Sequence, residues 1–193
     1  MAATIIDSGR RVFTNLKSIL FTPYTDESTL GDKTYDLVNI VGDTTSVEQA
    51  DNDVQTIEHE FSSSPLYESV TLGDKTFTCE CIDFQNDVLK NLFGWETEEG
   101  GDAFAPLDYK DLYCKVEMQF NSTKDIVVLP KLKMNSKAVL SSLKTDASRG
   151  TISGTCYPAY VKVGQKEHKT DMAIIGSTNA SSYSVSTTPT VVS

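Results

Sequence analysis

The chain of 193 residues carries a formal net charge of −10 at neutral pH, and 39% of its residues are hydrophobic. This length suits one globular domain with or without arms, and the composition is ordinary for a globular protein. An acidic chain argues against sequence-specific nucleic-acid binding, which favours a basic face. No apolar run approaches the roughly 20 residues of a membrane-spanning helix, and the first residues lack the long apolar core of a secretory signal, so we expect neither.

The charge is unevenly distributed along the chain. Residues 26–108 hold most of the acidic side chains and few lysines, whereas residues 109–193 hold more basic than acidic side chains. One interpretation is a solvated surface that keeps the protein soluble. The other is self-association in which the acidic half of one subunit meets the basic half of the next. Such a head-to-tail contact is heterologous and propagates into rings or filaments.

The two ends of the chain differ from its middle. Residues 1–17 have an irregular apolar pattern, so we expect an extended N-terminal arm. Residues 177–193 are rich in serine and threonine and predict a flexible C-terminal tail, which leaves residues 18–176 as one β domain. The apolar side chains of the arm are candidate inter-subunit contacts, namely Ile5, Ile6, Val12 and Phe13.

The predicted domain consists of short apolar or alternating segments that are typical of β-strands. The alternation is clearest at residues 113–120, where Cys114, Val116 and Met118 share one face. Residues 137–144 fit either a helix or a strand. The predicted strands cover residues 18–24, 34–41, 56–61, 76–84, 113–120, 125–129, 131–134, 151–163 and 171–175.

Two predicted loops place apolar side chains in an otherwise polar segment. Partners commonly dock on such exposed anchors, so we expect these loops to contact neighbouring subunits. The candidates are Leu66 and Tyr67 in residues 62–69, and Phe104 and Leu107 in residues 96–108.

Residues 86–94 change to a helical period. Asn86 or Asp87 can cap the start of a helix, and Gly94 suits the left-handed position after its end. A helix of about two turns is marginal alone, so its apolar side must pack on the strands. The side chains that stack on this side as i,i+4 pairs are Val88, Leu89, Leu92 and Phe93.

The phrase TLGDKTY at residues 29–35 recurs as TLGDKTF at residues 71–77. Each copy predicts a glycine-containing turn that leads into a strand. Two copies without further similarity do not indicate a repeat protein.

The sequence contains neither a known catalytic motif nor a cluster of metal ligands. The four cysteines match no zinc-ligand spacing, so we expect reduced thiols in the core. His59 lies between Glu58 and Glu60, but on a strand both glutamates point to the other face, which favours a half-buried histidine over a general base. His168 lies in a charged turn. We expect no enzymatic activity, no cofactor and no required metal.

The order of these features resembles that of the major tail tube proteins of tailed bacteriophages. The resemblance covers about residues 18–160 and begins with SILFTPY at residues 18–24. Its most specific part is the helical segment DVLKNLFGW at residues 87–95. The segments VLPKLKM at residues 128–134 and GTISGT at residues 150–155 add to it.

The resemblance implies a mainly β subunit, a sandwich or barrel with one flanking helix, that forms hexameric rings. The rings would stack into the tail tube of a virion, with loops and termini bridging them. The implied partners are further copies of the chain, other tail proteins, and DNA that passes through the lumen without specific binding. An acidic lumen would repel the phosphates. The protein would be made in the cytoplasm of the bacterial host.

Two other classes of protein remain as alternatives. A tail-terminator or head-completion protein has similar strands but closes a single ring instead of polymerising. A small ligand-binding β-barrel would need a polar pocket, for which the sequence offers no candidate.

Overall fold

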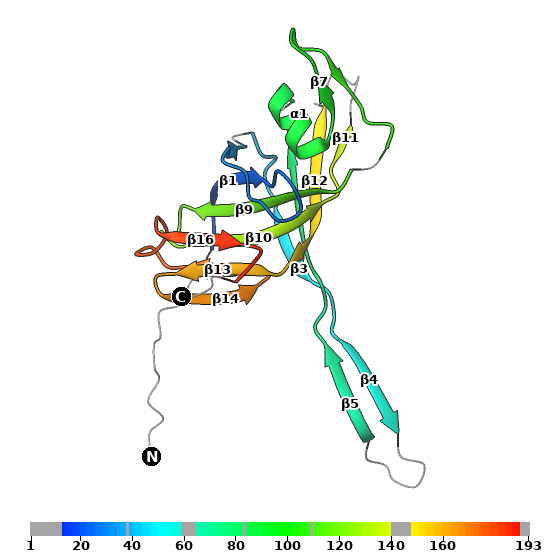
Figure 1. The fold of residues 1–193 in the computed structure, drawn as a ribbon, viewed down its shortest axis with the longest axis vertical. Coiled ribbons are helices and arrows are strands. Elements are labelled where there is room, and N and C mark those ends of the chain that lie inside the picture. The colour runs from blue at the N-terminus through cyan, green and yellow to red at the C-terminus, as the bar shows by residue number, and fades with distance from the viewer. Residues whose placement is uncertain are drawn as a thin grey trace.

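The computed structural model describes residues 13–37, 39–58, 65–82, 84–108, 110–139 and 148–189. Within these residues the chain is mainly β-strand with one short helix, which confirms the predicted fold class (Figure 1). No helix in this part of the chain is long and apolar enough to cross a membrane. The elements in chain order are β1 (Leu16–Pro23), β2 (Tyr35–Asp36), β3 (Ser46–Gln49), β4 (Asp53–Glu58), β5 (Pro65–Thr71), β6 (Lys75–Cys81), α1 (Asn86–Phe93), β7 (Glu96–Thr97), β8 (Ala103–Phe104), β9 (Leu112–Phe120), β10 (Ile126–Met134), β11 (Lys137–Val139), β12 (Arg149–Tyr157), β13 (Ala159–Val163), β14 (Lys166–Thr170), β15 (Ala173–Ile175) and β16 (Tyr183–Ser186).

The largest sheet is open and antiparallel, with the strand order β2-β1-β9-β10-β12-β6-β3. Strand β11 adds to β12, and β15 adds to β10. On β9, Cys114, Val116 and Met118 are buried and the residues between them are half-buried, which is the pattern of a strand with one face on a core.

One aromatic contact shows how strongly this sheet curves. The rings of Phe21 on β1 and Phe77 on β6 pack edge to face with 6.0 Å between their centroids, and both side chains are fully buried. Strands β9, β10 and β12 separate β1 from β6 in the sheet order. The sheet must therefore bend over its own apolar core, so its two halves face each other as in a sandwich.

Helix α1 packs its apolar side into the same core. Its docking residues, which are all buried, are Val88, Leu89, Leu92 and Phe93. Gly150 on β12 makes room for the helix, because a Cβ atom at this position would lie 2.4 Å from Cζ of Phe93. The close packing of Phe93 on β12 therefore requires a residue without a side chain at position 150.

The two ends of α1 are formed differently from each other. Gly94 adopts the left-handed conformation with φ of 72°, and the N–H of Trp95 donates to the Leu89 carbonyl at 3.0 Å. At the start, Gln85 is the N-cap residue and its side chain makes no capping hydrogen bond. The prediction that Asn86 or Asp87 caps the start of the helix is wrong, because both residues lie inside the helix.

Strand β10 is shared by two apolar clusters. Val127 and Leu129 belong to the main core, whereas Ile126 and Val128 pack in a second cluster beneath the small sheet β14-β13-β16. A strand buried on both faces needs apolar residues in succession, and β10 begins with Ile-Val-Val-Leu for this reason.

The C-terminal segment is not simply a tail. Tyr183–Ser186 forms β16, which pairs with β13, so the prediction of a tail is wrong there. Tyr183 and Val185 pack against the second apolar cluster. These two apolar residues alternate with serines, which is the pattern of a strand with one buried face. The high serine and threonine content of the segment led instead to the prediction of a tail.

Other strands in the structure have different bounds from those predicted. Residues 151–163 do not form one strand, because Pro158 separates β12 from β13 and the two belong to different sheets. In the described part of residues 34–41, β2 is the one strand, Ile40 adds an isolated bridge to Cys81, and Leu37 follows β2 and is buried in the core. Of residues 137–144, the first three form β11 and the others lie outside the described residues.

We expect the substitution Leu92→Ala to lower the free energy of unfolding by roughly 2–5 kcal/mol, because the side chain is fully buried and its removal leaves a cavity. Chemical denaturation measures the loss. The exposed Lys90 on the same helix supplies the control, since Lys90→Ala should change stability by less than about 0.5 kcal/mol. A loss below about 1 kcal/mol for Leu92→Ala would mean that the helix is peripheral.

Cys114→Ser should destabilise the chain by about 1 kcal/mol or more, because the new hydroxyl would be buried in the apolar core without an assigned partner. The control is Cys114→Ala, which removes the sulfur without adding a hydroxyl. Denaturation of the two variants under mild reductant should show a larger loss for serine. Equal stability of the serine variant and the parent would contradict the burial of this site.

Candidate assembly surfaces

Strands β4 and β5 form a two-stranded hairpin that projects from the body of the chain (Figure 1). Val54 and Val70 are directly paired across the hairpin, and the two residues are 51% and 54% exposed. Leu72, immediately after β5, is 69% exposed. Apolar side chains that remain together in water are typical of a contact surface.

The hairpin joins the body at a break in one long ribbon, in which β3 pairs with β6 and β4 pairs with β5. At the break the Ala50 N–H donates to the Asp74 carbonyl at 2.9 Å, and the Gly73 N–H donates to Oδ1 of Asn52 at 3.2 Å. A Cβ atom at Gly73 would lie 2.1 Å from the Ala50 carbonyl oxygen, so only glycine fits there. The glycine-containing turn predicted within residues 71–77 is not formed, and residues 72–74 connect β5 to β6, the strand predicted to follow.

The hairpin is acidic as well as partly apolar. Among the described residues, Asp51, Asp53 and Glu68 make no ion pair. Elsewhere the acidic and basic halves of the sequence already pair within one subunit, as in Glu27 with Lys131 at 3.7 Å. These carboxylates of the hairpin are therefore available to a neighbouring chain.

Strands β7 and β8 lie with α1 at the other end of the longest axis (Figure 1). Phe104 on β8 is 53% exposed and Leu107 is fully exposed. The Lys110 ammonium lies 3.4 Å from Oε1 of Glu96 beside them. Both predicted contact residues of this segment are therefore accessible to a neighbour.

The other predicted contact residues have different positions. Leu66 and Tyr67 lie in strand β5, and the prediction that they occupy a loop is wrong. Phe13 is half-buried, and its ring packs edge to face on Phe120 at 5.2 Å, so it contacts the core of its own chain. Ile5, Ile6 and Val12 lie outside the described residues.

The edges of the large sheet offer a second kind of surface. In the described part of the chain, β3 pairs with β6 on one side only, and β2 covers only two residues of β1 at the opposite edge. The backbone N–H and C=O groups of an unpaired edge can bind a strand of another chain.

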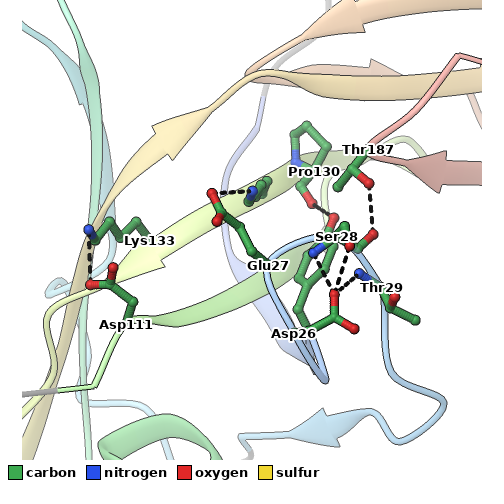
Figure 2. Close-up of polar contacts among 10 residues, drawn as sticks. Asp26, Glu27, Ser28, Thr29, Asp111, Pro130, Lys133 and Thr187 are labelled. Carbon is green, nitrogen blue, oxygen red and sulfur yellow. Dashed lines mark hydrogen bonds and ion pairs between the residues drawn. The ribbon is translucent and has the colours of Figure 1, made fainter.

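A polar clasp connects the first loop to the C-terminal segment (Figure 2). Oδ1 of Asp26 accepts hydrogen bonds from the N–H groups of Ser28 and Thr29 at 2.7 and 2.8 Å, which lowers the pKa of Asp26 to about 2. The hydroxyl of Thr187 donates to the Ser28 carbonyl at 2.7 Å. Sequence reasoning missed this clasp, although aspartate followed by serine two positions later is a signal for such a turn.

Two further contacts hold the same loop on β10. The Tyr24 hydroxyl donates to the Pro130 carbonyl at 2.8 Å, and burial raises the pKa of this tyrosine to about 12. The Lys131 ammonium on β10 lies 3.7 Å from Oε1 of Glu27 in this loop, and Lys133 on the same strand pairs at 2.9 Å with Asp111, which precedes β9 (Figure 2). The lysines of β10 are therefore committed within the subunit.

The cysteines, histidines and carboxylates of the described residues are the side chains that could take part in chemistry. They contain no group of three or more His, Cys, Asp or Glu side chains that could hold a metal ion. All four cysteines are buried and none is in a disulfide. Burial raises the pKa of Cys114 and brings that of Cys156 to about 12, so these two thiols stay protonated at neutral pH. His168 is exposed on β14, and His59 lies outside the described residues.

Comparisons with known proteins give a distant structural likeness. No protein-family model matches the chain, and no curated protein matches it. Among solved structures, the chain is similar to a chain in the cryo-EM structure of the anti-feeding prophage baseplate, six-fold symmetrised. The two share 10% sequence identity with a TM-score of 0.43, over 88% of this chain and 98% of that chain. A likeness this distant identifies neither a family nor a function.

We expect Gly73→Ala to lower the free energy of unfolding by about 1–3 kcal/mol, because the added methyl group would overlap the Ala50 backbone. Denaturant unfolding measures this loss. Gly42→Ala is the matched control, since a Cβ atom at Gly42 has no atom within 4 Å, and its effect should stay within about 0.5 kcal/mol. Equal effects of the two substitutions would contradict the described geometry of the joint.

Proposed function

We propose that this chain is a structural protein of a phage virion that self-assembles into stacked hexameric rings, and that the stack forms a tail tube. The observation that carries the proposal is the projecting hairpin β4–β5 with the exposed pair Val54 and Val70. Such a feature exposes apolar surface at a cost to the isolated subunit, and a neighbouring subunit would remove that cost. The resemblance of residues 18–160 to tail tube proteins supports the same conclusion.

Two kinds of contact would build the assembly. Within a ring, the open edges of the large sheet would pair with those of neighbouring subunits, which removes the exposed edges of the isolated chain. Between rings, the hairpin lies at one end of the longest axis, and β7, with which β8 pairs, lies at the other (Figure 1). Strand β8 carries the exposed Phe104, and the exposed Leu107 follows it in the sequence. Apolar surfaces at opposite ends suit a heterologous contact that repeats along one direction.

The hollow tube would deliver the genome. DNA would pass through the lumen without specific binding, because the acidic chain repels phosphate. The other partners in this proposal are further tail proteins of the virion, and synthesis takes place in the cytoplasm of the bacterial host. No catalytic step and no metal are part of the proposal.

A tail-terminator or head-completion protein is the second candidate. It would use the same sheet edges to close one ring. The exposed apolar surface at both ends of the long axis favours the tube over this alternative, because a terminal ring needs to stack on one side only.

We expect purified chain to form tubes in negative-stain electron microscopy at high concentration. Deleting residues 1–12, or substituting Leu66→Asp together with Tyr67→Asp, should leave a folded subunit that forms no long tubes. A charge-matched control is Ser181→Asp with Ser182→Asp, at exposed positions before β16, which should still polymerise. Circular dichroism would establish that each variant is folded.

Higher salt should slow the association of the parent by screening long-range charge, while apolar contacts persist. Variants of the arm and of β5 that polymerise as well as the parent would show that these segments are not contacts. Single rings without stacks would favour the terminator class.

A further inference from the structure

We propose that the face of hairpin β4–β5 that carries Val54 and Val70 binds residues 1–12 of a second copy of this chain. The inference rests on the proposed self-assembly and names the partner of one surface within it. The occupant is an extended segment that is both apolar and basic, because the hairpin face is both apolar and acidic.

The chemistry of the hairpin sets the requirements for its partner. Val54 and Val70 are exposed opposite each other, and Glu68 lies on the same face because it is two residues from Val70 in the strand. The stretch from Ala50 to Asp74 contains no lysine or arginine, and its acidic residues are at positions 51, 53, 58, 60, 68 and 74. A partner needs apolar side chains for the valines and positive charge for the carboxylates.

Residues 1–12 meet both requirements. Ile5 and Ile6 supply adjacent apolar side chains, and Arg10 with Arg11 supplies positive charge, against Asp7 as the sole acidic residue of this segment. Twelve extended residues span up to about 40 Å, which exceeds the length of roughly 20 Å of a six-residue strand such as β4. The segment is therefore long enough to lie along the hairpin while the rest of its chain remains in a neighbouring subunit.

The outer face of the small sheet is the competing basic surface, and it fits less well. Lys162 lies directly opposite Glu167 on β14, and the Lys169 ammonium lies 5.9 Å from the centre of the Tyr160 ring. Its cations therefore already have neighbours. It also lacks aliphatic side chains beside those cations, whereas residues 1–12 combine both chemistries.

Site-specific crosslinking tests the proposal directly. Two full-length chains of different tag length are mixed, one carrying Ile6→Cys and the other Val70→Cys, and treated with a short bis-maleimide. The natural cysteines are buried and interfere little, because their exposed surface is small. The matched control replaces Val70→Cys with Thr71→Cys, whose side chain is exposed on the opposite face of the hairpin.

The expected result is a heterodimer for Ile6→Cys with Val70→Cys, and at least about tenfold less product with Thr71→Cys. Adding Arg10→Glu and Arg11→Glu to the first chain should reduce the product by a similar factor, and Glu68→Lys in the second chain should restore part of it. Equal crosslinking at positions 70 and 71, or crosslinking to a cysteine at Lys162 instead, would overturn the proposal. Negative-stain images of the same mixtures show whether tubes form, so tubes without the selective crosslink would refute this contact while leaving the tube proposal intact.

Discussion

The packing of Phe21 against Phe77 is the contact on which the rest of the structure depends. It joins β1 and β6 across the core although β9, β10 and β12 lie between them in the sheet. This closure leaves β3 and β6 as one end of a bent sheet. The ribbon that continues from these two strands is the hairpin β4–β5, so the curvature of the core determines where the hairpin projects.

Two glycines then fix the elements attached to this core. Gly73 lets the ribbon pass the Ala50 backbone at the base of the hairpin, and Gly150 lets Phe93 of α1 approach β12. In both places a methyl group would meet an atom closer than 3 Å. The hairpin and the helix lie at opposite ends of the long axis of the molecule (Figure 1). The position of each relative to the core therefore requires a glycine at the point of contact.

The second apolar cluster explains why the C-terminal segment belongs to the fold. Ile126 and Val128 of β10 would be exposed without the small sheet, and β16 completes that sheet. The hydrogen bond from Thr187 to the Ser28 carbonyl then secures the segment on the first loop (Figure 2). The loop itself is ordered by Asp26, so a single carboxylate links the beginning and the end of the described chain.

Local patterns in the sequence predicted what depends on local chemistry. The alternation on β9 and the helical period ending at Gly94 are each specified by neighbouring residues. The break of residues 151–163 at Pro158 could have been found, because proline cannot donate to a ladder. Strand β16 could not be recognised with the same ease, since its stability comes from packing against β10, more than fifty positions earlier in the sequence. The position of Leu66 and Tyr67 in a strand likewise depends on pairing with β4.

The candidate surfaces were only partly accessible to sequence reasoning. Exposed Phe104 and Leu107 stand out as apolar residues in a polar segment. Val54 and Val70 do not, because alternating valines are typical of a buried strand face, and only the projection of the hairpin leaves them in water. The charge asymmetry was also misleading in part, since Glu27 and Lys131 are paired within one subunit.

Hydrogen exchange of the backbone amides, compared between dispersed and assembled protein, tests the central claim most directly. In this account a neighbouring subunit covers the hairpin, so amides of β4 and β5 should exchange much more slowly in the assembly than in the dispersed chain, while amides of the buried strand β9 should change little. Equal exchange of the hairpin amides in the two states would contradict the claim that this hairpin is an assembly surface.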